Sequence, residues 1–134
     1  MKLAFASAAW VDEARRVLED LVSTRGEAGR KFSVCERFTT APTDVAPSGT
    51  AAWHFRIDGK SVTVGAGEIG DADVQITADY RATLPAARLV YTREILAARA
   101  TQRAAAPPPG IKGDMTKAPP YLVELHNRLA LVTV

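Results

Sequence analysis

Apolar and polar residues alternate along four stretches in the first eighty residues of the chain, and this alternation is typical of β-strands with one buried face. The four predicted strands are residues 31–39, 51–57, 60–66 and 73–78. In the two middle strands Trp53, Phe55, Val62 and Val64 share one face, and His54, Arg56, Ser61 and Thr63 share the other. The pattern therefore predicts a sheet with one apolar and one polar face.

Asp58-Gly59 separates the two middle strands, and this dipeptide favours a two-residue hairpin loop with a type I′ turn. A loop of that length fixes the register of the hairpin. The predicted pairs are Ile57 with Lys60, Phe55 with Val62 and Trp53 with Val64.

Helical patterns flank the strands. Residues 7–24 form the first predicted helix, whose apolar face contains Trp10, Ala14, Val17, Leu18 and Leu21. Asp79 or Thr83 can cap a second helical segment that contains Pro85, and Thr92 can cap a third, "REILAARATQRAAA". The prolines of "PPPG", residues 107–110, end that third helix.

The last part of the chain contains a short extended piece and a final helix. "IKGDM" is predicted to pair as an edge or penultimate strand. Pro119-Pro120 opens a helix with Leu122, Leu125 and Leu129 on one face, and the terminal "LALVTV" is apolar enough to dock on the body. The order of a helix, a cluster of strands and further helices predicts one α+β domain over residues 1–134, with its helices on one face of the sheet.

Composition narrows the class of protein. The 134 residues are 47% hydrophobic and 24% charged, which is typical of a folded globular domain. The single cysteine, Cys35, excludes an internal disulfide and fits a reducing compartment. Only Leu3, Ala4 and Phe5 precede the A-x-A-like site at residues 6–8, which is too short for a signal peptide. We therefore expect a cytoplasmic protein, and no apolar run is long enough to span a bilayer.

The net charge of the chain is small, but the charged residues are unevenly distributed along it. The net charge of +2 gives no indication of nucleic-acid binding. Residues 81–103 carry five arginines against Glu94 alone; they are Arg81, Arg88, Arg93, Arg99 and Arg103. This run is either a solvated helix face or a patch for peripheral contact with an anionic membrane, an anionic headgroup or a partner protein.

The sequence contains little that could carry out chemistry. We interpret His54 and His126 as surface residues and Cys35 as a buried or half-buried thiol, and no spacing of ligands predicts a metal. Glu68, Asp71 and Asp73 lie in a Gly-rich connection and are expected to form turns. Gly65, Gly67 and Gly70 match a dinucleotide-binding pattern, but a strand follows them instead of a helix. We therefore predict no catalytic residues, no metal and no cofactor.

The order of these pieces resembles the sterol carrier protein-2 family of lipid-binding domains. The resemblance rests on "WHFRIDGKSVTVGAGE", on "DADVQITAD" leading into a helix, and on "IKGDM" followed by a leucine-bearing helix, and it covers roughly residues 10–130. It implies a curved, mostly antiparallel five-stranded sheet covered by helices around an apolar cavity, and a non-catalytic carrier of lipids. "AAAPPPG" departs from the family's usual lead into the "IKGD" strand, and the ending "LVTV" is not a peroxisomal address.

Three functions follow from these observations. The first is binding of a lipid or other apolar small molecule between sheet and helices, against the alternative that the layer is filled core. The expected wall consists of Phe38, Trp53, Phe55, Val62, Val64, Ile76, Leu84, Leu89, Ile95, Leu96, Met115, Leu122 and Leu125. The second is an isomerase-type enzyme, for which Glu36 is the one acid on the apolar face. The third is an accessory subunit that contacts a partner through "LALVTV"; the oligomeric state stays open.

Overall fold

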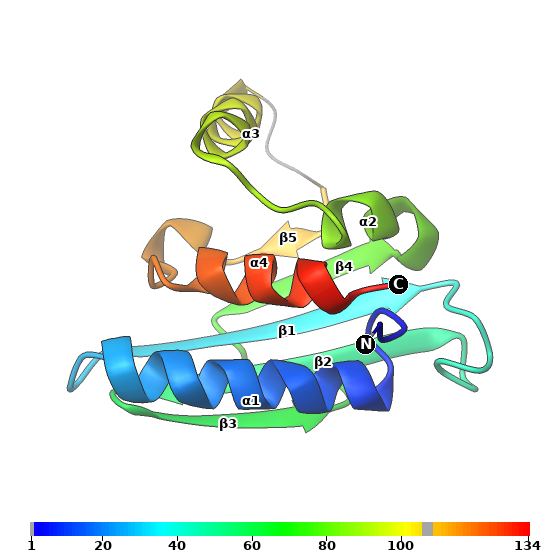
Figure 1. Cartoon of the computed structure of the whole chain (residues 1–134), viewed down its shortest axis with the longest axis horizontal. Coiled ribbons are helices and arrows are strands. Elements are labelled where there is room, and N and C mark those ends of the chain that lie inside the picture. Colours follow the sequence, from blue (N-terminus) through cyan, green and yellow to red (C-terminus); the bar gives the residue numbers. More distant parts are fainter. Residues whose placement is uncertain (1, 106–108) are drawn as a thin grey trace.

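The order of helices and strands follows the order that the hydrophobic pattern predicts (Figure 1). This computed structural model describes residues 2–105 and 109–134. Within these residues the elements are α1 (Ala8–Arg25), β1 (Lys31–Thr39), β2 (Thr50–Asp58), β3 (Ser61–Ala66), β4 (Val74–Asp79), α2 (Tyr80–Ala87), α3 (Arg93–Ala105), β5 (Ile111–Lys112), the 3₁₀ turn η1 (Met115–Lys117) and α4 (Leu122–Val132). Pro107 and Pro108 of the predicted helix stop lie outside the described residues.

One sheet holds five strands in the order β3-β2-β1-β4-β5 within the described part of the chain. The pairs β2–β3, β1–β2 and β4–β5 are antiparallel, and β1 and β4 are parallel. The sheet is therefore mostly antiparallel, and the prediction of an α+β fold is confirmed. β5 comes from "IKGDM" and forms an edge strand, as expected.

The β2–β3 hairpin exists, but its predicted register is wrong. Trp53 pairs with Ala66, Phe55 with Val64 and Ile57 with Val62, because the loop residues are Gly59 and Lys60 instead of Asp58 and Gly59. Gly59 has φ +62°, whereas Lys60 is not among the residues with positive φ. That combination fits a type II′ turn, which takes glycine at its first central position. The shift of two residues keeps every side chain on its predicted face.

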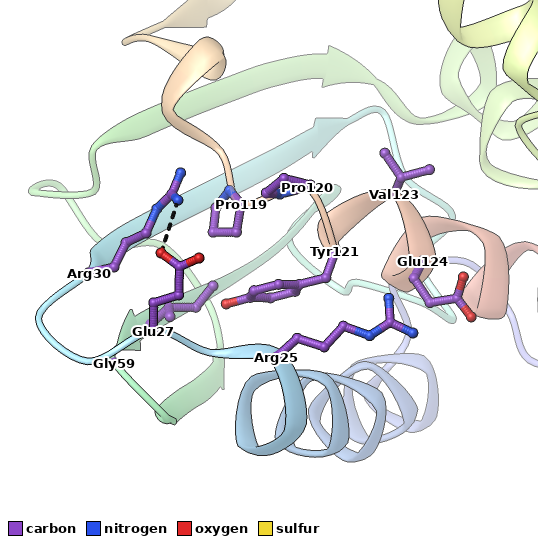
Figure 2. A pocket seen from close by; sticks show the side chains of 10 residues that line it. Arg25, Glu27, Arg30, Gly59, Pro119, Pro120, Tyr121, Val123 and Glu124 are labelled. Atoms are coloured by element: carbon purple, nitrogen blue, oxygen red, sulfur yellow. Dashed lines mark hydrogen bonds and ion pairs between the residues drawn. The ribbon is translucent and has the colours of Figure 1, made fainter.

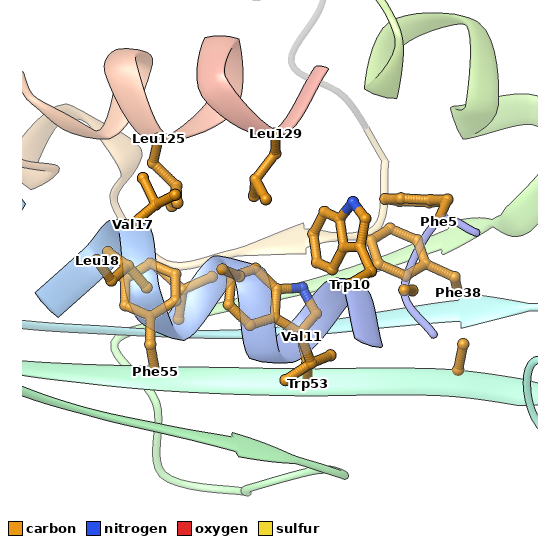
Figure 3. Packing of buried hydrophobic residues seen from close by; sticks show 14 of the residues in the cluster. Phe5, Trp10, Val11, Val17, Leu18, Phe38, Trp53, Phe55, Leu125 and Leu129 are labelled. Atoms are coloured by element: carbon orange, nitrogen blue, oxygen red, sulfur yellow. The ribbon is translucent and has the colours of Figure 1, made fainter. Parts of the chain in front are cut away.

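Helix α1 packs on the apolar face of the sheet. Ser7 caps the helix, its Oγ accepting from the Trp10 amide at 3.3 Å. All five residues of the predicted apolar face are buried. Figure 3 shows Trp10 and Leu18 of this helix among Phe38, Trp53 and Phe55 of the sheet. The Trp10 and Trp53 rings meet edge to face, with 5.2 Å between their centroids. An aromatic cluster therefore forms the centre of the core.

Helix α4 lies beside α1 and completes the apolar layer (Figures 1 and 3). Leu125 and Leu129 are buried, and Leu122 packs against the core from a partly buried position. The terminal residues dock as expected, because Leu3 and Thr133 form a parallel bridge. Trp10 Nε1 donates to Thr133 Oγ1 at 3.0 Å inside this junction.

The Gly-rich connection, residues 67–73, contacts the polar face of the sheet at β1 and β2. Arg37 pairs with Glu68 and Arg56 pairs with Asp71. Ser33 donates to the Asp73 carboxylate from its amide at 2.9 Å and from its hydroxyl at 3.1 Å. The acids of this connection therefore hold the loop on the sheet. Cys35 is a free, fully buried thiol.

Helices α2 and α3 follow β4. Asp79 caps α2, with its carboxylate accepting from the Ala82 amide at 2.9 Å, and Thr92 Oγ1 accepts from the Ile95 amide at 3.2 Å near the start of α3. Both caps agree with the prediction. α3 stands apart from the sheet (Figure 1), and none of its residues is buried. No helix of the described residues is both long and apolar enough to cross a membrane.

Candidate functional site

A small cavity lies in the apolar layer between the sheet and the helices. Its volume is about 110 Å³. The lining residues come from the N-terminal segment, α1, β1, β2, α2 and α4, and they are Phe5, Trp10, Glu36, Trp53, Ala87, Leu125, His126 and Leu129. Two polar side chains, Glu36 and His126, therefore face a space that is otherwise aromatic and aliphatic.

Glu36 enters this cavity because of its position in β1. It has the same parity as Phe32, Val34 and Phe38, all of which are buried on the apolar face. Burial raises the pKa of the Glu36 carboxyl to about 7, and the nearby Trp53 indole N–H opposes part of that rise. Glu36 keeps some accessible surface because it lines the cavity. Near neutral pH the carboxyl is therefore divided between its neutral and ionised forms.

Trp53 lies directly opposite Glu36 in the β1–β2 ladder. The residue is 2% exposed, and its Nε1 is buried without a hydrogen-bond partner among the described residues. The indole N–H is close enough to Glu36 to favour the ionised carboxylate, but the two groups do not meet the geometry of a hydrogen bond. A buried donor without a partner is costly, so this N–H is available to a polar atom that enters the cavity.

His126 and Tyr91 stack beside the cavity. Their ring centroids are 3.8 Å apart, with an angle of 11° between the planes. The Arg99 guanidinium of α3 lies over the outer face of Tyr91, at 4.8 Å from the ring centroid. His126 Nε2 donates to the Leu89 carbonyl at 2.8 Å, which assigns the proton to Nε2 when the ring is neutral. The stack therefore joins α4, α3 and the segment between α2 and α3.

The electrostatics of this stack favour neutral rings. Burial lowers the pKa of His126, the hydrogen bond to Leu89 opposes this effect, and Arg99 lowers the pKa further. Burial raises the pKa of Tyr91, with Arg99 and Arg103 opposing the rise and Glu36 adding to it. At neutral pH both rings are uncharged, so the titrating group of the cavity is Glu36.

A larger, more open cleft of about 390 Å³ lies between the end of α1, the β2–β3 turn and the start of α4 (Figure 2). Its lining residues are Arg25, Glu27, Arg30, Ile57, Gly59, Pro119, Pro120, Tyr121, Val123 and Glu124. Figure 2 shows the Tyr121 ring between Arg25 and the Glu27–Arg30 pair. Within the described part of the chain, the cleft shares no lining residue with the Glu36 cavity.

The structure distributes the predicted wall residues over three environments. Trp53 and Leu125 line the Glu36 cavity. Packed in the core or partly buried against it are Phe38, Phe55, Val62, Val64, Ile76, Leu84 and Leu122. Ile95 and Leu96 lie half-buried on α3, while Leu89 and Met115 are 41% and 40% exposed. The residues on the sheet and α4 thus form one layer, and Met115 lies in η1 at the surface.

Most polar side chains of the cavity and the cleft could not be assigned to these sites from the sequence. Glu36 could be found from its strand parity, and the enzyme hypothesis named it. His126 was expected at the surface, but it lines the cavity, because α4 turns this side chain toward the segment between α2 and α3. Tyr121 was weighed from the sequence only as a nucleic-acid contact, together with Tyr80 and Tyr91, and was not assigned to a small-molecule site, although "APPYL" places its ring directly after two prolines at the start of the final helix. No group of three potential metal ligands occurs among the described residues.

Comparisons with known proteins add one structural likeness. No family model matches the chain, and no curated protein matches it by sequence. A solved structure titled "UbiJ-SCP2 Ubiquinone synthesis protein" aligns over 96% of this chain and 96% of its own, with 15% identity and a TM-score of 0.47.

Proposed function

We propose that the protein binds an apolar molecule with one uncharged polar group in the layer between sheet and helices, without catalysing a reaction. The observation that carries this proposal is the buried indole N–H of Trp53, a residue that lines the cavity beside Glu36; within residues 2–105 and 109–134 this N–H has no hydrogen-bond partner. A hydroxyl or carbonyl oxygen at this point accepts from the indole. A hydroxyl can also donate to Glu36 when that carboxyl is ionised.

The volume of the cavity limits what enters it. Ligand sites usually measure about 300–1,000 Å³, whereas this space measures about 110 Å³. It accommodates the polar end of a ligand, and the apolar body extends toward the segment between α2 and α3. Leu89 and Val90 there are each 41% exposed, and α3 contributes no buried residue. Leu89, Ile95 and Leu96 would thus cover the outer part of the ligand, with Leu84 beneath it.

The expected affinity follows from the apolar area. A chain that buries about 300 Å² gains roughly 7 kcal/mol at about 25 cal/mol per Å², part of which is lost to ordering the ligand. Ionised Glu36 repels a carboxylate headgroup, so a neutral headgroup is preferred above pH 7. The proposal therefore predicts that decanol binds more tightly than decanoate at pH 8.

The test has two stages. Solvent extraction of the purified protein, with mass spectrometry, should reveal a co-purifying apolar molecule. Calorimetric titration with decanol then compares the wild type with Trp53→Phe, which removes the indole N–H but retains an aromatic ring. Loss of this hydrogen bond should weaken binding by about fivefold. Arg56→Gln, on the polar face, should bind as the wild type does. Absence of a co-purifying molecule together with no heat of binding would reject the proposal in favour of a filled core.

Glu36 also supports a second candidate function, proton transfer on an apolar substrate. A carboxylate with a pKa near the working pH, held in an apolar space, is suited to act as a general base. Its oxygen would remove the α-proton of a ketone, and the Trp53 N–H would stabilise the negative charge on the enolate oxygen. The proton on Glu36 exchanges with water, and Glu36 then returns a proton or, in D₂O, a deuteron to the carbon, so the reaction needs no cofactor.

Deuterium exchange distinguishes this second function from simple binding. Cyclopentanone is incubated in D₂O with the wild type or with Glu36→Gln, and loss of the α-proton signal is followed by NMR. Catalysis predicts faster exchange with the wild type than with the variant. Equal rates would reject the enzyme function and leave the binding function unaffected.

A further inference from the structure

We propose that the segment between α2 and α3 is a docking surface for a lipid bilayer that contains anionic lipids. The surface consists of Arg88, Leu89, Val90 and Arg93, and we call it the 88–93 surface. It leads into α3, the helix that stands apart from the sheet (Figure 1). This inference goes beyond the cavity ligand proposed above and does not depend on it.

The 88–93 surface exposes two neighbouring aliphatic side chains between two cations. Leu89 and Val90 are each 41% exposed, and Arg88 and Arg93 on either side are exposed as well. Such a combination suits the boundary of a bilayer, where aliphatic groups enter the acyl region and arginines meet lipid phosphates. A purely acidic partner would pair with the arginines but would leave both aliphatic side chains in water.

Hydrogen bonds to α4 fix the backbone of the 88–93 surface. His126 Nε2 donates to the Leu89 carbonyl at 2.8 Å. The Asn127 side chain accepts from the Tyr91 amide at 2.8 Å and donates to the Tyr91 carbonyl at 3.2 Å. Val90 therefore lies between two anchored residues. Because the backbone is already anchored, docking on a bilayer costs little ordering of this segment.

The positive charge of the chain is concentrated around this surface. Residues 80–105 contain five arginines and one glutamate, a net charge of +4, whereas the whole chain has +2, so the remaining residues carry a net −2. None of these five arginines forms an ion pair within residues 2–105 and 109–134. Arg99 lies over the Tyr91 ring, a contact that leaves its charge uncompensated. The charges are thus available to anionic groups outside the chain.

Nearby carboxylates reduce this positive charge but do not cancel it. Asp79 caps α2. Burial raises the pKa of Tyr80, Asp44 adds to the rise and Arg88 opposes it, so both charges lie near that ring. Counting Asp44 and Asp79 together with residues 80–105 leaves +2, and Glu36 of the cavity beneath subtracts at most one more. The surplus is therefore positive in every case, which favours an anionic lipid surface.

Sedimentation with lipid vesicles tests the proposal. One set of vesicles is phosphatidylcholine, and the other is three parts phosphatidylcholine to one part phosphatidylglycerol. We expect the full chain to bind the anionic vesicles at least about tenfold more strongly than the neutral ones, and high salt to weaken this binding. Equal binding to both sets, or no binding to either, would overturn the proposal.

A pair of double variants locates the contact. Arg88→Gln/Arg93→Gln should weaken binding to the anionic vesicles about thirtyfold. Arg25→Gln/Lys60→Gln is the matched control: it removes the same charge from exposed residues at the end of α1 and in the β2–β3 turn, and it should bind nearly as the wild type does. Equal weakening by the two double variants would show attraction by net charge alone and would reject the 88–93 surface.

The aliphatic contact and the class of partner need separate measurements. Val90→Ser should weaken vesicle binding about fivefold, and unchanged binding would reject the 88–93 surface as the contact. Retention of the wild type on immobilised polyglutamate, with no vesicle binding, would assign the surface to an acidic protein and overturn the bilayer proposal. Decanol binding should be unchanged in Arg88→Gln/Arg93→Gln, so failure here is distinguishable from failure of the cavity proposal.

Discussion

Replacing Glu36 by glutamine should stabilise the protein at alkaline pH and have less effect at acidic pH. The folded state raises the pKa of this carboxyl to about 7, so it holds its proton more tightly than the unfolded chain does. The free energy of unfolding of the wild type therefore falls as the pH rises from about 4.5 to 7, and the loss is complete above pH 7. Glutamine resembles the protonated acid and cannot ionise.

The magnitude follows from the two pKa values. Each pKa unit corresponds to about 1.36 kcal/mol, so a rise from about 4.5 to about 7 corresponds to about 3 kcal/mol. Glu36 keeps part of its surface toward the cavity, where water screens its charge. We therefore expect the advantage of Glu36→Gln over the wild type to grow by about 1–3 kcal/mol between pH 4.5 and pH 8.

Urea denaturation at a series of pH values measures this difference directly. Other titrating groups, His126 among them, are common to both proteins and cancel in the comparison. Glu13→Gln is the matched control, because Arg16 lowers the pKa of Glu13 and places its linkage below about pH 4.5, with the opposite sign. The difference between Glu13→Gln and the wild type should therefore stay nearly constant between about pH 5.5 and pH 8. A constant difference between Glu36→Gln and the wild type from pH 4.5 to pH 8 would refute the assignment of Glu36 to a desolvated site.

Three further changes test the fold around the sites. Gly59→Val should lower the free energy of unfolding by about 1 kcal/mol or more, because a β-branched residue resists the φ of +62° at this turn; an unchanged melting temperature would show the turn to be wrongly assigned. Trp10→Phe removes the indole N–H that donates to Thr133 Oγ1 in the core, and it should lower the free energy of unfolding, measured by urea denaturation, by about 2 kcal/mol. Asn127→Ala removes the acceptor of the Tyr91 amide, at 2.8 Å, and should speed hydrogen exchange of that amide; an unaltered rate would argue against this contact.

Much of the fold could be predicted because local patterns and tertiary packing agree. The parity of Trp53 and Phe55, the apolar face of α1 and the cap at Asp79 each specify an element without knowledge of the rest. The hairpin register could not be predicted, because Asp58-Gly59 and Gly59-Lys60 are both acceptable two-residue loops. The sequence alone does not distinguish a type I′ turn from a type II′ turn here, since glycine suits both.

The sites were less predictable than the fold, because they depend on contacts between distant segments. Glu36 could be assigned to the apolar face from β1 alone, but the cavity also requires His126 of α4. The cleft joins Arg25, Gly59 and Tyr121, which are far apart in the chain. The α3 residues Ile95 and Leu96 are apolar and were expected to line the apolar cavity, yet no residue of this helix is buried. The local sequence pattern does not indicate whether a helix packs against the sheet.

The bridge between Leu3 and Thr133 has a consequence for how the protein is made. The Leu3 amide donates to the Val132 carbonyl at 2.6 Å, and the Val134 amide donates to the Leu3 carbonyl at 2.8 Å. The central strand β1 pairs with β2 on one side, but its other edge can pair only after β4 has been synthesised. Contacts of such long sequence separation slow folding. During synthesis Trp10 therefore stays without its Thr133 partner until residue 133 has left the ribosome, and a nascent chain exposes an aromatic surface that chaperones can bind.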